Sequence, residues 1–107
     1  MQFVALRGRL LPGAVAEYKN AHDHIPVEVL DGQRAAGLRR WLIFQDGLDL
    51  VHVTECEDFD ESMRLLAGFP ADQQWQRRMA AHKQPVDESG NTERRLQLIY
   101  QRDLWLP

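Results

Sequence analysis

The sequence is poor in cysteine. Its single cysteine, Cys56, cannot form a disulfide within the chain, so nothing points to an oxidising compartment. Because Cys56 falls near the end of an apolar strand pattern, we expect it to be a small core residue. The C-x-x-C and H-E-x-x-H patterns that bind zinc are also missing, and we predict no metal site.

Long apolar runs and an excess of basic charge are missing as well. No stretch approaches the ~20 apolar residues of a membrane span, and Met1–Arg9 carries arginines where a signal peptide needs an apolar region. We therefore expect a cytoplasmic protein with no membrane partner. The net charge of −3 argues against a nucleic-acid partner. With 107 residues, we expect a single α+β barrel domain over 1–107 with one modest core.

The hydrophobic pattern predicts strands and helices in the order βαββαβ. Alternation predicts strands over 2–10, 38–45, 48–57 and 96–106, while helical spacing predicts helices over 14–24, 27–36, 59–69 and 71–81. Asp46-Gly47 predicts a tight hairpin turn, and the polar segment Lys83–Arg95 predicts a surface loop. This order is typical of the ferredoxin-like α+β fold, an antiparallel sheet with helices on one face.

One predicted strand carries bulky apolar side chains on both faces. In 38–45, Trp41 and Ile43 point one way while Leu42 and Phe44 point the other. Since the helices cover only one face of the sheet, the other apolar face needs a cover. A second copy with two-fold symmetry is the simplest cover. We expect a homodimer packed sheet against sheet, a dimeric α+β barrel, with each pocket between a sheet and its own kinked helix.

The first helix carries the candidate site. Tyr18 and His22 lie four residues apart and therefore share one face of the helix. Both side chains exchange hydrogen bonds or protons, and histidine titrates nearest to neutral pH. Pro26 cannot bond the carbonyl of His22, so the helix should kink or end there. A half-buried packing pair is the alternative interpretation, and we expect His24, on another face, to meet solvent.

Several residues together resemble the L-rhamnose mutarotase family over nearly the whole chain. They are Glu17-Tyr18, His22, Trp41, Gln74-Trp75, Met79 and the terminal Leu104-Trp105-Leu106-Pro107. The resemblance implies a dimeric isomerase that interconverts the α and β anomers of a free monosaccharide without a cofactor. It places His22 as the catalytic proton donor, Tyr18 in substrate binding, and sugar contacts at Trp41 and Trp75.

The chain departs from the family pattern at two places. After the histidine the family reads Trp-Pro-Glu, whereas this chain has Pro26-Val27-Glu28, and Gln76 stands where the family has a second tryptophan. These changes alter the expected pocket wall. They leave L-rhamnose, another 6-deoxyhexose and a lost activity open as alternatives.

Two other classes of function remain open. The same fold serves cofactor-free monooxygenases or isomerases that act on aromatic intermediates, because a fold does not fix a function. In a non-catalytic ligand-binding module, His22 would only pack. His52 and Tyr100 lie on predicted strands that could face a pocket, but we interpret both as ordinary sheet residues.

Overall fold

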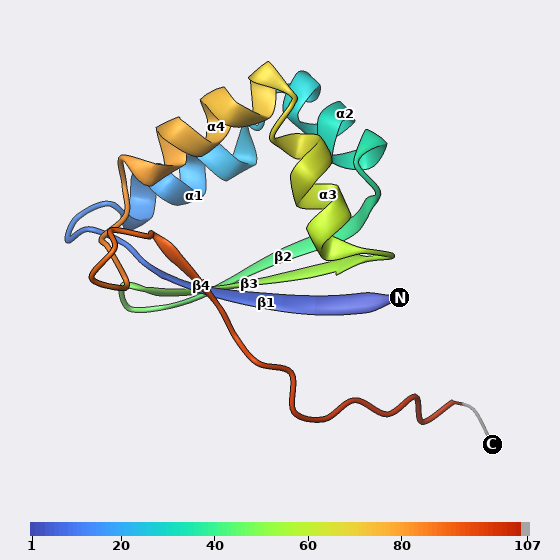
Figure 1. Cartoon of the computed structure of the whole chain (residues 1–107). Helices are drawn as coiled ribbons and strands as arrows, with labels where there is room; N and C mark the ends of the chain where they lie inside the picture. The colour runs from blue at the N-terminus through green and yellow to red at the C-terminus, as the bar shows by residue number, and fades with distance from the viewer. Residues whose placement is uncertain (106–107) are drawn as a thin grey trace.

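The computed structural model describes residues 1–105 and contains a four-stranded antiparallel sheet with all its helices on one face (Figure 1). The elements are β1 (Gln2–Arg9), α1 (Val15–Asp23), α2 (Val27–Ala35), β2 (Leu38–Asp46), β3 (Asp49–Cys56), α3 (Phe59–Leu66), α4 (Pro70–Ala80) and β4 (Glu93–Arg95). The strand order β2-β3-β1-β4 is the ferredoxin-like order, so the predicted fold class is confirmed.

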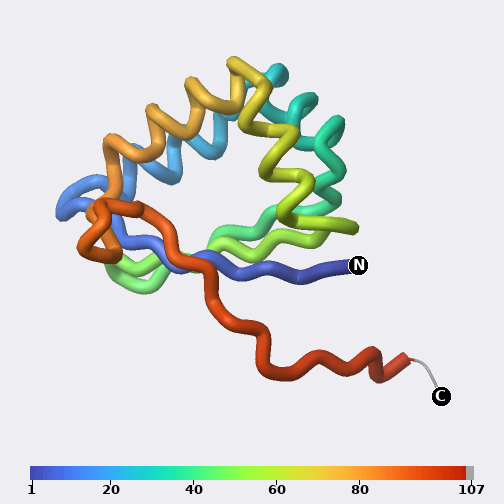
Figure 2. The backbone as a smooth tube through the Cα atoms, in the orientation of Figure 1, coloured from blue at the N-terminus to red at the C-terminus, as the bar shows by residue number. Residues whose placement is uncertain are grey.

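A proline divides each helical segment into two helices. Pro26 precedes α2, and Pro70 begins α4 at a position where a missing N–H costs nothing. The two bent segments arch over the sheet, as the tube in Figure 2 shows. The break predicted at Pro26 is confirmed, and it leaves Tyr18 and His22 on α1 above the sheet.

A two-residue turn sets the register of the central hairpin. Gly47, at φ +59°, adopts the left-handed conformation that this turn requires. Asp46 then pairs with Asp49, which places Ile43 opposite His52. Side chains on a strand alternate between the faces, so Trp41, Ile43 and His52 all lie beneath the helices.

The core fills the space between that face and the helices. Its larger part, under α1, α2 and α4, consists of Leu10, Tyr18, Ala21, Val29, Leu50, Trp75 and Met79. A smaller part under α3 consists of Val4, Leu6, Cys56 and Phe59. Asp58 caps α3 by accepting the backbone N–H of Glu61, as its place before the helix predicts. Cys56 is fully buried, which confirms the prediction of a small core residue.

The prediction for the C-terminal quarter is wrong. The expected loop Lys83–Arg95 contains β4, and residues 96–105 of the expected strand 96–106 form no strand. β4 is short and polar, so alternation does not reveal it, yet it pairs with β1 with Glu93 opposite Gly8. Beyond Leu96, whose N–H bonds the Ala5 carbonyl at 2.8 Å, the chain leaves the sheet (Figure 1). Residue 106 lies outside the described residues.

This departing segment and the uncovered sheet face both expose large apolar side chains. On the sheet these are Phe3, Leu42 and Phe44, the last 58% exposed; on the segment they are Leu98, Ile99, Tyr100, Leu104 and Trp105. Tyr100 is 72% exposed and lies in no strand, so its interpretation as a sheet residue is wrong. Among residues 1–105, no helix is long and apolar enough to cross a bilayer.

Candidate active site

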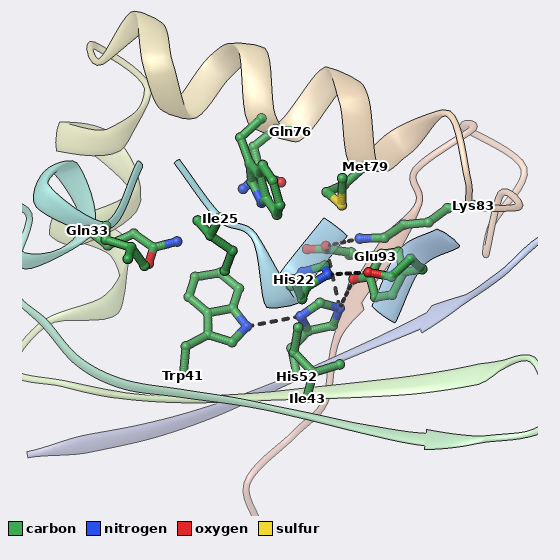
Figure 3. A pocket seen from close by; sticks show the side chains of 13 residues that line it. His22, Ile25, Gln33, Trp41, Ile43, His52, Gln76, Met79, Lys83 and Glu93 are labelled. Carbon is green, nitrogen blue, oxygen red and sulfur yellow. Dashed lines mark hydrogen bonds and ion pairs between the residues drawn. The ribbon is translucent and has the colours of Figure 1, made fainter. Parts of the chain in front are cut away.

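A cavity of about 240 Å³ lies between the sheet and helices α1 and α4 (Figure 3). All four residues that the sequence singled out line it: Tyr18, His22, Trp41 and Trp75. Three residues that the sequence predictions left aside line it too: His52, Lys83 and Glu93. Because drug-sized ligands occupy pockets of about 300–1,000 Å³, this cavity suits a small molecule.

His22 forms the helix side of the cavity. Its Nδ1 lies 2.8 Å from the backbone oxygen of Tyr18, one turn earlier. A carbonyl oxygen only accepts, so Nδ1 carries the hydrogen and donates, and the neutral ring keeps a lone pair on Nε2. The rings of Tyr18 and Trp75 lie 4.4 and 5.2 Å from the imidazole, centroid to centroid, and hold its orientation.

The surroundings of His22 favour its neutral form. Burial lowers the pKa of His22 below its usual value, and the nearby charges of Lys83 and Arg78 lower it further. The hydrogen bond to the Tyr18 carbonyl and the charge of Asp23 oppose this shift. At neutral pH, His22 is therefore a base, and its Nε2 bonds no side chain or backbone group among residues 1–105.

His52 forms the sheet side of the cavity and has partners at both ring nitrogens. The indole Nε1 of Trp41 donates to Nδ1 of His52 at 3.0 Å, while Nε2 lies 3.4 Å from the Tyr18 hydroxyl oxygen. The pKa of His52 is lowered to about 4, chiefly by burial and also by the charges of Lys83 and His22, against the opposing charge of Glu93. His52 is therefore neutral at pH 7.

An ion pair lines the cavity near Tyr18. Lys83, only 7% exposed, donates to Glu93 at 2.7 Å, and its ammonium lies 5.6 Å from the centre of the Tyr18 ring. A buried ammonium needs such a carboxylate partner. Burial raises the pKa of Tyr18, and the Glu93 carboxylate raises it further, so the hydroxyl keeps its proton.

The three additional residues differ in whether the sequence could have predicted their place in the cavity. His52 could have been placed from the hairpin turn, because a two-residue turn puts it on the same face as Trp41. Lys83 and Glu93 carry no such signal, since they come together only when β4 pairs with β1. His24 is exposed, as expected. No cluster of metal-binding side chains occurs within residues 1–105.

Comparison with known proteins gives a direct result for the family. The model of the L-rhamnose mutarotase family matches residues 3–102. The chain belongs to the L-rhamnose mutarotase family. Two proteins named L-rhamnose mutarotase, from Burkholderia orbicola and Burkholderia ambifaria, are each 46% identical to it over 46 residues. The matched segment is 43% of this chain and 44% of each relative, so it spans less than half of their length.

Solved structures confirm the fold of this family member. An L-rhamnose mutarotase from Formosa agariphila is similar with a TM-score of 0.77 at 19% identity, over 96% of this chain and 100% of that one. Tetracenomycin F2 cyclase from Streptomyces glaucescens follows with a TM-score of 0.69 at 16% identity, over 96% and 100% of the two chains. At these identities the likeness concerns the architecture alone, which different chemistries share.

Proposed function

We propose that this protein is a mutarotase, an isomerase that interconverts the α and β anomers of a free hexose, such as the 6-deoxyhexose L-rhamnose. The observation that carries the proposal is that Nε2 of His22, which no described residue bonds, and the protonated hydroxyl of Tyr18 belong to one small cavity. Mutarotation needs one group that takes the proton of the anomeric hydroxyl and another that protonates the ring oxygen, and both oxygens are bonded to C1. Membership of the L-rhamnose mutarotase family supports the proposal.

The reaction opens the cyclic hemiacetal and closes it again. In opening, Nε2 of His22 takes the proton of the anomeric hydroxyl, the bond between C1 and the ring oxygen breaks, and Tyr18 gives its proton to that oxygen. The aldehyde then turns about the C1–C2 bond, and the two protons return as the ring closes on the other face. Acid–base groups of this kind contribute about 10²–10⁴-fold each.

This sequence gives His22 both halves of the proton transfer. Because its pKa is lowered, the resting ring is neutral and first accepts a proton. It becomes the proton donor of the family resemblance only in the closing step, when the imidazolium returns that proton. The raised pKa of Tyr18 keeps its proton in place until negative charge develops on the ring oxygen.

The walls of the cavity suit a deoxy sugar. The indole of Trp75 offers an apolar surface for sugar C–H groups, and Trp41 offers a ring edge on the sheet side. Ile25, Leu30 and Met79 supply aliphatic surface for a methyl group. Gln33 and Gln76 offer amides to hydroxyl groups, and Gln76 does so where the family has a second tryptophan.

The test of the function is saturation-transfer NMR between anomers. The panel contains L-rhamnose, L-fucose, other 6-deoxyhexoses and common aldohexoses, each measured with and without the protein. We expect faster anomer exchange for at least one 6-deoxyhexose. If the folded protein accelerates none of the sugars, the proposal fails, and oxygen uptake with a quinol would then point to the monooxygenases of the same fold.

We also propose that the protein works as a homodimer in the cytoplasm. The uncovered sheet face exposes Phe3, Leu42 and Phe44, and the segment after β4 carries further exposed apolar side chains, including Trp105 at 96%. A second copy would cover both. Sedimentation should give twice the chain mass, and Phe44→Glu should shift it to the mass of one chain. A monomeric wild type would refute the dimer.

A further inference from the structure

His52 is the residue of the cavity whose hydrogen bonds are most constrained. The charged or polar groups around it come from four parts of the chain: Tyr18 and His22 from α1, Trp41 from β2, Lys83 from the segment after α4, and Glu93 from β4. Its side chain is only 3% exposed, so water does not replace these partners. The protein therefore fixes the position of its proton.

The partner at Nδ1 decides which tautomer is present. An indole N–H only donates, so Nδ1 of His52 must accept from Trp41 with its lone pair. The remaining proton then sits on Nε2, which faces two oxygens: the Tyr18 hydroxyl at 3.4 Å and Glu93 at 4.0 Å. Both oxygens can accept this hydrogen, so the tautomer that Trp41 requires also suits the Nε2 side of the ring. A second proton on Nδ1 would point straight at the indole N–H, 3.0 Å away.

This tautomer determines the direction of the Tyr18 hydroxyl. The nearer acceptor for the Nε2–H is the Tyr18 oxygen, since Glu93 lies beyond hydrogen-bond distance and already accepts from Lys83 at 2.7 Å. An oxygen that accepts from His52 cannot point its own hydrogen back at that ring. The hydrogen is left to donate elsewhere, and the Tyr18 side chain lines the cavity.

We propose that His52 is a positioning residue: held by Trp41 as the Nε2–H tautomer, it turns the Tyr18 hydroxyl proton into the cavity, toward the ring oxygen of the sugar. This inference rests on the proposed function. It gives Trp41 a second role, which is to hold the tautomer of His52. Its indole N–H donates to His52, so only its ring can contact the substrate.

Two substitutions at His52 test the inference by kinetics. His52→Phe fills the same space and removes both hydrogen bonds, whereas His52→Gln retains an N–H donor on the Tyr18 side. Losing one oriented hydrogen bond should lower kcat for anomer exchange about 10-fold in His52→Phe, with KM changed less than about 3-fold. His52→Gln should recover most of that loss. A residue that only fills space would show neither the separation of kcat from KM nor the recovery.

A second measurement does not depend on activity. Trp41→Phe identifies the side-chain N–H signal of Trp41 in a ¹H–¹⁵N spectrum, and His52→Phe should move that signal upfield and speed its exchange with water. An unmoved signal overturns the inference, as does an active His52→Phe within 2-fold of the wild-type kcat or a His52→Gln as impaired as His52→Phe. A wild type that accelerates no sugar refutes the proposed function instead, and the indole signal then decides the placement of His52.

Discussion

The two walls of the cavity each carry a histidine, and the two histidines are bonded in opposite ways. On the helix wall, His22 donates through Nδ1, and no residue in the described range 1–105 bonds its Nε2. On the sheet wall, His52 accepts at Nδ1 and faces Tyr18 through Nε2. Burial is the largest cause of a lowered pKa in both. A neutral imidazole is thus a base on one wall and a fixed donor on the other, depending only on its neighbours.

The comparison predicts that His22→Ala has the largest effect on anomer exchange. It removes the base proposed for the reaction, so the rate should fall about 10²–10⁴-fold toward that of the uncatalysed sugar. Saturation transfer on the best sugar of the panel measures it.

The structure offers a closely matched control for this variant. His24 lies two residues on and bonds the Asn20 carbonyl through Nδ1 at 2.9 Å, the same bond to a preceding turn that His22 makes. It is exposed and does not line the cavity. His24→Ala should keep full activity. Equal losses in the two variants would mean that helix stability, and not a base, is at issue.

The next effect is expected at Trp75 on the helix wall. Trp75→Ala removes the aromatic surface beside His22 and part of the core, and we expect KM for the sugar to rise about 10-fold with a lower melting temperature. Trp75→Phe keeps an aromatic face and should restore most of the affinity. If Trp75→Phe binds the sugar as poorly as Trp75→Ala, a contact specific to the indole, and not stacking on an aromatic face, holds the sugar.

On the sheet wall, breaking the ion pair should affect stability more than catalysis. Glu93→Gln leaves the buried Lys83 ammonium without a charged partner, which should lower the free energy of unfolding by about 1–3 kcal/mol. The loss is limited to this range because Glu93 is itself partly exposed. Urea unfolding measures the loss. Lys83→Met combined with Glu93→Gln should be more stable than Glu93→Gln alone. A double variant that is less stable would contradict the pairing.

The last effect concerns pH. The pKa of His52 is about 4 in the folded protein and about 6.5 in the unfolded chain, so only the unfolded chain takes up this proton between those values. The contribution to stability is therefore complete above pH 6.5 and declines as the pH falls toward 4. His52→Gln lacks it, so the urea midpoints of wild type and variant should converge on acidification. A constant difference would show that the pKa of His52 is not lowered.

The sequence predicts those features that depend on neighbours along the chain. Pro26, the Gly47 turn and the Tyr18–His22 spacing are local signals, and each has the expected structure. The side of the sheet on which His52 lies follows from the hairpin register. The two-residue turn sets that register, whereas the polarity of His52 alone does not indicate its side.

The remainder depends on contacts between distant segments. Lys83 and Glu93 meet through the three-residue strand β4, whose residues are all charged, and no periodicity marks so short an element. The alternation over 96–106 predicts a strand, yet beyond Leu96 the described part forms no strand of the sheet. An alternating pattern indicates that a segment can pair as a β-strand, but it does not indicate which strand is the partner.

The most direct test of the account is the tautomer of each histidine at pH 7, read from two-bond ¹H–¹⁵N correlations, with His22→Ala and His52→Gln assigning the signals. We expect Nδ1–H for His22, with an unprotonated Nε2, and Nε2–H for His52. If His22 carries its proton on Nε2, that nitrogen cannot act as a base toward the sugar. A doubly protonated His52 would contradict the fixed Nε2–H tautomer proposed for it.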